Sequence, residues 1–451
     1  MSLSDLLGIG ASGTRAYRAA MGAVSENITN ATTDGYNRRT VLLAESASSA
    51  TTSQLYKPGV AFGGVDVVSI VRKNDEYLDL AARIATGNYE NVNARATWLD
   101  NVQSALDDGS LGVGQRLTTM FSSVERLASN PTDTTLKTNA LFSIEQVNSS
   151  FKQTANDLDT VKTGILTEAR NGVDALNSAA ARLASTNEAL RRAIPGSSNA
   201  AQLLDQRDQA LTDMSKRLNI AVNFGSNGVA NVTFDGKSVV DNINSSSFAV
   251  SAATDGTLSF TVDGAAVVDP ESGSLAGLAD SAETTAGRVT SLNNLATQYV
   301  KDMNDWHKGG FVANPNAPTN GAAGGDILSM TGGITTLQMA FTDTSKLATY
   351  SSDGRVNGNL VAISNIRGTN SVENGWTAII SAHANQLATT NAEQSAASLR
   401  DQQAQAARAD VSGVDLDREA ADLMRLQQAY QGCARIIQVS RETFDSIMQA
   451  F

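Results

Sequence analysis

Glycine-rich segments are the first features of this sequence that could bind a ligand. GIGASG, residues 8–13, matches the pattern G-x-G-x-x-G, which holds a dinucleotide pyrophosphate when it follows a β-strand and begins a helix. Only seven residues precede this segment and they have a helical pattern, so we interpret its glycines as small residues that permit close helix packing. GAAGGD, residues 321–326, lacks the Lys-Ser or Lys-Thr of a phosphate-binding loop, and we predict an ordinary loop there.

The titratable side chains have little of the pattern that catalysis needs. Asp205 and Asp208, in the segment LLDQRDQAL, could form an acid–base pair, but we interpret them as a solvated helix face beside Arg207. His307 falls at the end of a predicted helix. We expect it to cap that helix, because the sequence offers no partner nucleophile for it.

Composition excludes further classes of function. The net charge of -12 over 451 residues does not favour binding to phosphate backbones, so we expect no nucleic-acid partner. The two histidines and the single cysteine, Cys433, are too far apart in sequence for zinc-ligand spacing, and we interpret Cys433 as a small packing residue. We therefore expect no catalytic residues, no metal and no cofactor, and a protein that is not an enzyme.

The first residues do not resemble a secretory signal peptide. MSLSDLLGIGASG has no basic region and no long apolar core. No stretch of the chain reaches the roughly 18 apolar residues that span a bilayer. We expect a soluble protein without membrane contact which, if exported, leaves by a route that removes nothing from it.

The periodicity of apolar residues predicts a mainly α fold with a small antiparallel β insert. Helices are expected near the N-terminus and over residues 74–106, 111–129, 130–194, 199–218, 280–308, 372–409 and 412–451. Asn130 is the predicted N-cap of the fourth helix, with Pro131 in its first turn, and Ser412 that of the last, with Asp415 three residues on. Alternating residues and three Asp-Gly pairs predict the β insert at 219–278, whereas 309–371 gives no clear pattern.

Both ends of the chain carry heptad patterns typical of helices that lie along other helices. The pattern predicts an assembly seam of apolar residues: Leu3, Leu7, Tyr17, Met21, Val24 and Ile28 near the start, and Leu416, Leu423, Leu426, Tyr430, Cys433, Ile437, Phe444 and Ile447 near the end, continuing to Phe451. The four glycines of the N-terminal helix each cost it about 1 kcal/mol relative to alanine, so it needs a partner helix. We expect the C-terminal helix to be that partner, and the seam to contact other copies.

These patterns predict a hairpin-like molecule whose ends meet and whose middle projects. We expect a terminal coiled-coil domain formed by 1–34 and 410–451, a helical body formed by 35–218 and 279–409, and an outer β domain at 219–278.

The segment NITNATTDGYNRR, residues 27–39, breaks the first helix. Asn30 and Thr33 disfavour a continued helix because their side chains compete for nearby backbone groups. The pair Asp34-Gly35 predicts a turn, since glycine adopts positive φ at little cost. We expect an elbow from which Tyr36 and Arg38 lead outward as an extended segment.

The elbow also resembles the N-terminal signature of flagellar rod, hook and hook-associated proteins, N-(I/V)-A-N-x-x-T-x-G-(Y/F)-x-R. The matching residues are Asn27, Ile28, Asn30, Thr33, Gly35, Tyr36 and Arg38, and Thr29 replaces the usual alanine. LLDQRDQAL at 203–211, DMNDWHKGGF at 302–311 and the segment 412–447 are similar to the hook-associated members that form the hook–filament junction.

This resemblance implies a structural axial protein of the bacterial flagellum that self-assembles through its terminal helices. It implies several partners: other copies of the chain, the hook protein below, a second junction protein and the filament above, and a cytoplasmic export chaperone at the C-terminal helix. It also implies secretion by flagellar type III export to the extracellular hook–filament junction. The alternatives are a hook or rod subunit, a secreted helical adhesin or effector, and a wall hydrolase, which would need a catalytic pair within 219–371.

Overall fold

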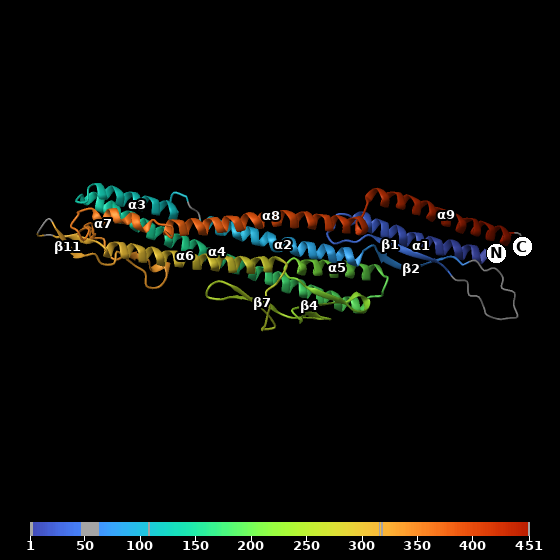
Figure 1. Ribbon diagram of the computed structural model, residues 1–451. Helices are drawn as coiled ribbons and strands as arrows, with labels where there is room; N and C mark the ends of the chain where they lie inside the picture. Colours follow the sequence, from blue (N-terminus) through green and yellow to red (C-terminus); the bar gives the residue numbers. More distant parts are fainter. Residues whose placement is uncertain (1–2, 47–62, 107–108, 315, 317–318, 450–451) are drawn as a thin grey trace.

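The computed structural model describes residues 3–46, 63–106, 109–314, 316 and 319–449 and shows a long, mainly helical molecule (Figure 1). Its helices are α1 (Leu3–Thr29), α2 (Glu76–Ala105), α3 (Val113–Ser129), α4 (Thr134–Arg192), α5 (Ser198–Ser215), α6 (Ser274–Lys308), α7 (Gly358–Ala362), α8 (Val372–Ser412) and α9 (Leu416–Gln449). The predicted fold class, mainly α with a β insert in the middle of the chain, is confirmed.

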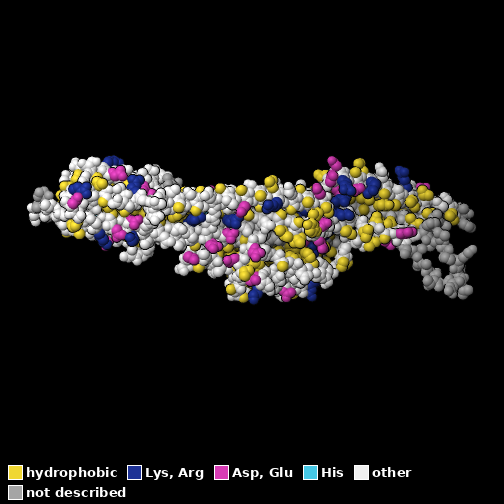
Figure 2. Space-filling model, viewed as in Figure 1, with side chains coloured by type: hydrophobic (Ala, Val, Ile, Leu, Met, Phe, Trp, Pro, Cys, Tyr) yellow, Lys and Arg dark blue, Asp and Glu magenta, His cyan; other side chains and the backbone are white. Residues whose placement is uncertain are grey.

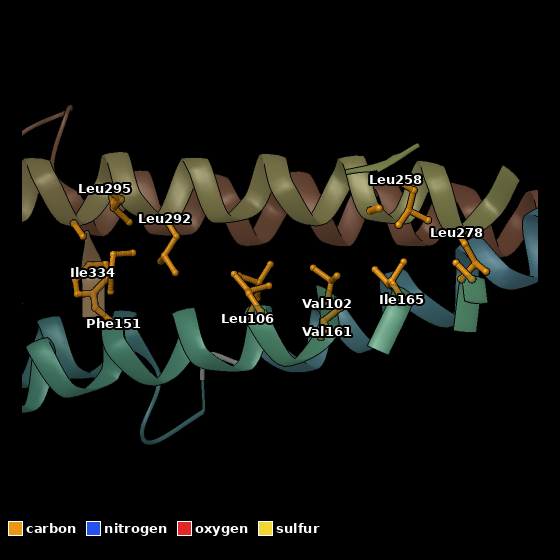
Figure 3. Packing of buried hydrophobic residues seen from close by; sticks show 14 of the residues in the cluster. Val102, Leu106, Phe151, Val161, Ile165, Leu258, Leu278, Leu292, Leu295 and Ile334 are labelled. Carbon is orange, nitrogen blue, oxygen red and sulfur yellow. The ribbon is translucent and has the colours of Figure 1, made fainter. Parts of the chain in front are cut away.

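The body is a bundle in which α2, α4, α6 and α8 lie side by side. α4 alone has 59 residues and therefore extends about 88 Å. Ile144, Phe151, Leu158 and Ile165 recur every seven residues along it and are fully buried. Figure 3 shows side chains of α2, α4 and α6 pointing into this common core. The heptad pattern therefore produces a long, thin core.

Two predicted helix caps are wrong, and in both cases a nearby aspartate is the cap. Asp133, not Asn130, begins α4, because its carboxylate accepts two hydrogen bonds from N–H groups of the first turn. Asn130 instead ends α3. Asp415 caps the start of α9 in the same way as Asp133 caps α4, because its carboxylate accepts hydrogen bonds from two N–H groups of the first turn. The Ser412 hydroxyl instead donates a hydrogen bond to the Arg408 carbonyl at the end of α8.

The β insert forms two small antiparallel sheets along one side of the body (Figure 1). The first contains β3 (Ala221–Phe224), β4 (Ala230–Phe234), β5 (Lys237–Asp241) and β6 (Asn244–Ser245), and the second β7 (Phe248–Ala252), β8 (Leu258–Val262) and β9 (Ala265–Val267). Asn187 and Asn177 of α4 fasten the two sheets by bonding the backbone of Ala230 and Phe248. The predicted range 219–278 is too long, because α6 already begins at Ser274.

The end of the molecule far from the termini is not the β insert but the segment that gave no sequence pattern. Residues 309–371 fold there into short strands, β10 (Phe311–Ala313), β11 (Asn320–Ala323), β12 (Leu328–Ser329) and β13 (Gln338–Met339), together with α7, beside α3 (Figure 1). The expectation that His307 caps a helix is wrong. Its buried imidazole accepts a 3.0 Å bond from Ala348 N–H at Nε2 and donates a 2.7 Å bond from Nδ1 to the Gly325 carbonyl.

Both histidines are held neutral, which predicts a pH dependence. His383 bonds the Leu99 carbonyl at 2.8 Å and faces Arg288, and burial lowers the pKa of His307 and of His383. The unfolded chain therefore binds protons first as the pH falls below about 6.5, and the free energy of unfolding decreases from there down to the folded pKa values. Because the chain has two histidines, imidazole NMR signals of the folded protein report on them directly. Neither signal is expected to titrate near pH 6.5, and one that did would contradict the prediction.

Within the described residues, no helix has the length and apolar character needed to cross a lipid bilayer.

Candidate functional site

The two termini form one helical module at the same extremity of the molecule, because α1 and α9 pack side by side in antiparallel directions (Figure 1). Gly10 and Gly13 face α9 so closely that an added Cβ would lie 2.8 Å from Ile437 Cγ1 and 2.6 Å from Cys433 Sγ, respectively. This confirms that glycines of the GIGASG segment permit close helix packing. Cys433 is half-buried and not disulfide-bonded.

The predicted seam residues are only partly covered within one molecule. Val24 is buried, and the half-buried members are Leu7, Tyr17, Met21, Ile28, Leu423, Leu426, Tyr430, Cys433 and Ile437. Leu416, Phe444 and Ile447 are about half exposed. The side chains of Leu3 and Phe451 lie outside the described residues. The seam between copies remains a prediction.

The closeness of α1 and α9 predicts different effects for two glycines of one helix. Gly13→Leu is expected to destabilise the helix pair by about 1–3 kcal/mol, because the new side chain must displace Cys433. Gly22 has no atom within 4 Å of a built Cβ, so Gly22→Leu is expected to stabilise α1 by several tenths of a kcal/mol. Hydrogen exchange of the α1 amides in the purified protein measures both. Equal protection in the two variants would contradict the close-packing interpretation.

The elbow does not lead outward as predicted; it reverses the chain. Gly35 has φ 76°, and after it β1 (Arg39–Glu45) pairs with β2 (Val65–Arg72) in a hairpin that runs back along α1. Val65 N–H bonds the Ser12 hydroxyl of α1 at 3.1 Å. Both strands of the hairpin contact α1, although Leu42, Val67, Val68 and Val71 remain 41–57% exposed. α1 therefore packs between the hairpin and α9.

Asn27 is the centre of the elbow. Its buried side-chain oxygen accepts bonds from the Tyr36 hydroxyl at 2.8 Å and Arg39 N–H at 2.9 Å. Its nitrogen donates to the Arg39 carbonyl and to the Glu419 carboxylate, both at 2.9 Å. Only a side chain with both donors and an acceptor satisfies four such groups. Asn27 thus links the end of α1, the elbow and α9.

The polar residues after Asn27 end the helix as predicted. Asn30 donates a 3.0 Å bond to the Glu26 carbonyl, one turn back, and the Thr33 hydroxyl bonds the Asn30 side chain at 3.3 Å. Burial raises the pKa of Tyr36 to about 12, so its hydroxyl remains a donor to Asn27.

Glu419 fastens α9 to the elbow through an ion pair. Its carboxylate is fully buried and accepts a 2.5 Å bond from Arg38 Nε. The backbone N–H of Arg38 also bonds the carbonyl of Ser412 at the end of α8, at 2.9 Å. Glu419 is thus the buried counter-ion of Arg38.

The prediction that Asp205 and Asp208 form a solvated helix face is wrong. Asp205 accepts bonds from Arg39 at 2.9 Å and from Arg72 at 2.8 Å, with its side chain 11% exposed. Asp208 accepts a 2.5 Å bond from Arg72 and a 2.6 Å bond from Arg207, with its side chain 4% exposed. Since cations hold both carboxylates, neither is available as an acid or base.

We call this cluster the elbow network and define it as Asn27, Tyr36, Arg38, Arg39, Arg72, Asp205, Arg207, Asp208 and Glu419. It joins α1, the β1–β2 hairpin, α5 and α9 at the point where the terminal module meets the body. The role of the network is structural, because its buried, paired charges fix one arrangement of these four segments. In the described part of the chain, no group of three His, Cys, Asp or Glu side chains has an arrangement that could hold a metal ion.

Two family models match the chain. Residues 99–327 match the flagellar hook-associated protein FlgK helical domain, and residues 408–450 match the flagellar basal body rod FlgEFG protein C-terminal region.

Curated relatives agree with these matches. Flagellar hook-associated protein 1 of Salmonella typhimurium (strain LT2) is 27% identical over 233 residues, which are 51% of this chain and 41% of that protein. The protein of the same name from Bacillus subtilis (strain 168) is 23% identical over 493 residues, covering 96% of this chain and 95% of the relative. The matched region thus spans less than half the length of the Salmonella relative.

A solved structure has a similar fold. The flagellar hook junction protein FlgK from Burkholderia pseudomallei superposes on this chain with a TM-score of 0.62 at 13% sequence identity. The superposition covers 73% of this chain and 100% of the Burkholderia chain.

Proposed function

This chain belongs to the family of the flagellar hook-associated protein FlgK, and from that premise we propose that it is a structural subunit of the junction between hook and filament. The observation that carries the proposal is the terminal module. Both chain ends form one narrow helical pair at one extremity, and the elbow network fixes that pair to a long body (Figure 1). Such a shape suits a tube with an inner helical layer and an outer layer of bodies.

We infer the following arrangement in the assembly. The module of α1 and α9 forms the inner layer, through the predicted seam, and the body and the β insert face outward. The partners are other copies of this chain, the hook protein on one side, and a second junction protein and the filament on the other. A cytoplasmic export chaperone holds α9 by helix-in-groove packing before flagellar type III export delivers the chain to the extracellular junction.

A hook or rod subunit is the second candidate, because residues 408–450 match the C-terminal model of rod proteins. That match covers α9 and the last residues of α8, but not α1. The match of residues 99–327 to the FlgK helical domain covers the body and favours the junction.

The proposal predicts a specific phenotype for loss of the gene. Cells without it are expected to build hooks that carry no filament and to release flagellin into the medium, because a filament needs the junction as its base. Restoring the gene should restore filaments, and antibody labelling should mark the hook–filament boundary. Loss of the hook itself would favour the hook or rod alternative, and unchanged filaments would contradict both.

A further inference from the structure

Three exposed apolar side chains form a ridge on the first turns of α2. Tyr77, Leu80 and Ile84 are 77%, 47% and 55% exposed and lie on one helix face, since they are spaced three and four residues apart. Figure 2 shows hydrophobic side chains gathered where the body meets the β strands. An exposed patch of this kind on a soluble surface marks an interaction site.

A groove of about 390 Å³ lies between this ridge and the start of the β insert. Its other wall contains the apolar residues Leu218, Val222 and Phe224, together with polar residues such as Asn219 and Ser272. The groove extends along α2 from Glu76 to Asn88, which is about 18 Å. These dimensions suit one or two turns of an apolar helix.

Arg83 lies in the groove as a cation without a direct partner. The residue is 9% exposed, and its side chain forms no hydrogen bond or ion pair with any described residue. The nearest carboxylates are occupied, because Asp79 pairs with Arg408 and Asp208 pairs with Arg72 and Arg207. Burial lowers the pKa of Arg83. A carboxylate that enters an apolar groove would complete this site.

The last described turns of α9 carry the complementary chemistry. Phe444, Ile447 and Met448 are 53%, 47% and 63% exposed, and Asp445 is exposed beside them. Gly10 packs on Ile437, so in an antiparallel pair the residues from Phe444 onward lie at or beyond the start of α1. Among the described residues, no helix of the same molecule therefore covers this end of α9.

We propose that the groove of one copy receives the end of α9, residues 444–448, from a second copy, with Asp445 pairing with Arg83. The contact cannot form within one chain, because Ile447 lies about 47 Å along α9 from Leu416, on the far side of the elbow from the body (Figure 1). Two different surfaces then meet head to tail, which generates a ring or an open helical array instead of a twofold dimer. The inference rests on the proposed function, since it names a contact between copies in the axial structure.

Charge exchange tests the pairing in cells that lack the gene and carry a plasmid copy. Arg83→Glu and Asp445→Arg are each expected to reduce the number of filaments per cell at least tenfold, and the double variant should return it to near the wild-type number. Rescue by the double variant excludes misfolding as the cause of the losses. Wild-type filament numbers in the Arg83→Glu strain, or no rescue by the double variant, would overturn the inference.

Cysteine crosslinking tests the identity of the occupant. In a Cys433→Ser background, Ile84→Cys with Ile447→Cys should give disulfide-linked multimers of this chain in oxidised, isolated flagella, and Val268→Cys with Ile447→Cys should not. A crosslink to a protein of another mass, or no crosslink in assembled flagella, would overturn the second-copy assignment. Failure of the wild-type gene to restore filaments would instead contradict the proposed function.

Discussion

Asp205→Ala is expected to lower the free energy of unfolding by about 3–5 kcal/mol, the cost of removing one partner from a buried ion pair. Asp205 receives hydrogen bonds from Arg39, Arg72 and Asn37, at 2.9, 2.8 and 2.8 Å. Without its carboxylate, the ion-pair partners left among the described residues are Glu26 for Arg39, with a side chain 46% exposed, and Asp208 for Arg72. Two buried cations would lose a counter-ion, and the elbow would lose the hydrogen bonds of Asn37 and Arg39 to α5.

A matched variant lies on the same helix. Asp213 of α5 pairs with Arg182, whose side chain is 57% exposed, so Asp213→Ala is expected to change stability by no more than about 1 kcal/mol. Urea denaturation of both purified variants measures the difference. If Asp205→Ala lowered the free energy of unfolding as little as Asp213→Ala, the elbow network would not stabilise the fold.

Glu419→Ala is expected to release the terminal module from the body at a similar cost, about 3–5 kcal/mol. The substitution leaves the Arg38 guanidinium with Asp422, at 3.5 Å, and removes one of the two acceptors of the Asn27 amide nitrogen. Because these contacts connect α9 to the elbow, the damage should concentrate in the termini. In cells the expected result is hooks without filaments, since the module cannot hold its orientation in a tube.

Hydrogen exchange separates this local effect from global unfolding. Amides of α1 and α9 should exchange faster in Glu419→Ala, whereas those of α4 should not change. Asp422→Ala provides the control, because its side chain is 30% exposed and its contact with Arg38 is longer. An equal increase in exchange rate across α1, α4 and α9 would contradict the inference that Glu419 acts only on the attachment of the terminal module.

The sequence predicted the parts of the molecule where a local pattern of residues is compatible with one local structure alone. The heptads of α4 and α9 predict long helices because one apolar stripe must be buried along the whole length. The Asp-Gly pairs at 235 and 263 predict hairpins, and both residues of each pair adopt positive φ. Asn30 and Gly35 predicted the elbow itself, since each acts on backbone groups within a few residues.

The errors share a different cause. LLDQRDQAL has the same sequence pattern whether its carboxylates face water or arginines, and Arg39 and Arg72 are more than 130 residues away in the chain. The reversal of the elbow likewise depends on contacts of the β1–β2 hairpin with α1. The adjacent arginines Arg38 and Arg39 in one segment and the two aspartates in the other were a signal. Charge pairs have no sequence periodicity, however, so the partner of each charge could not be identified.

By itself, the sequence determined the helices, the turns, the likeness of the terminal regions to flagellar axial proteins and the tendency of the two ends to pair, because these follow from short-range periodicity and side-chain size. The tertiary structure alone decided how the terminal module is joined to the body. That joint consists of hydrogen bonds such as Asn27 to Glu419 and Arg39 to Asp205, whose partners are 392 and 166 residues apart. Such bonds gain their strength from burial, and burial exists only after the helices and the hairpin have packed together.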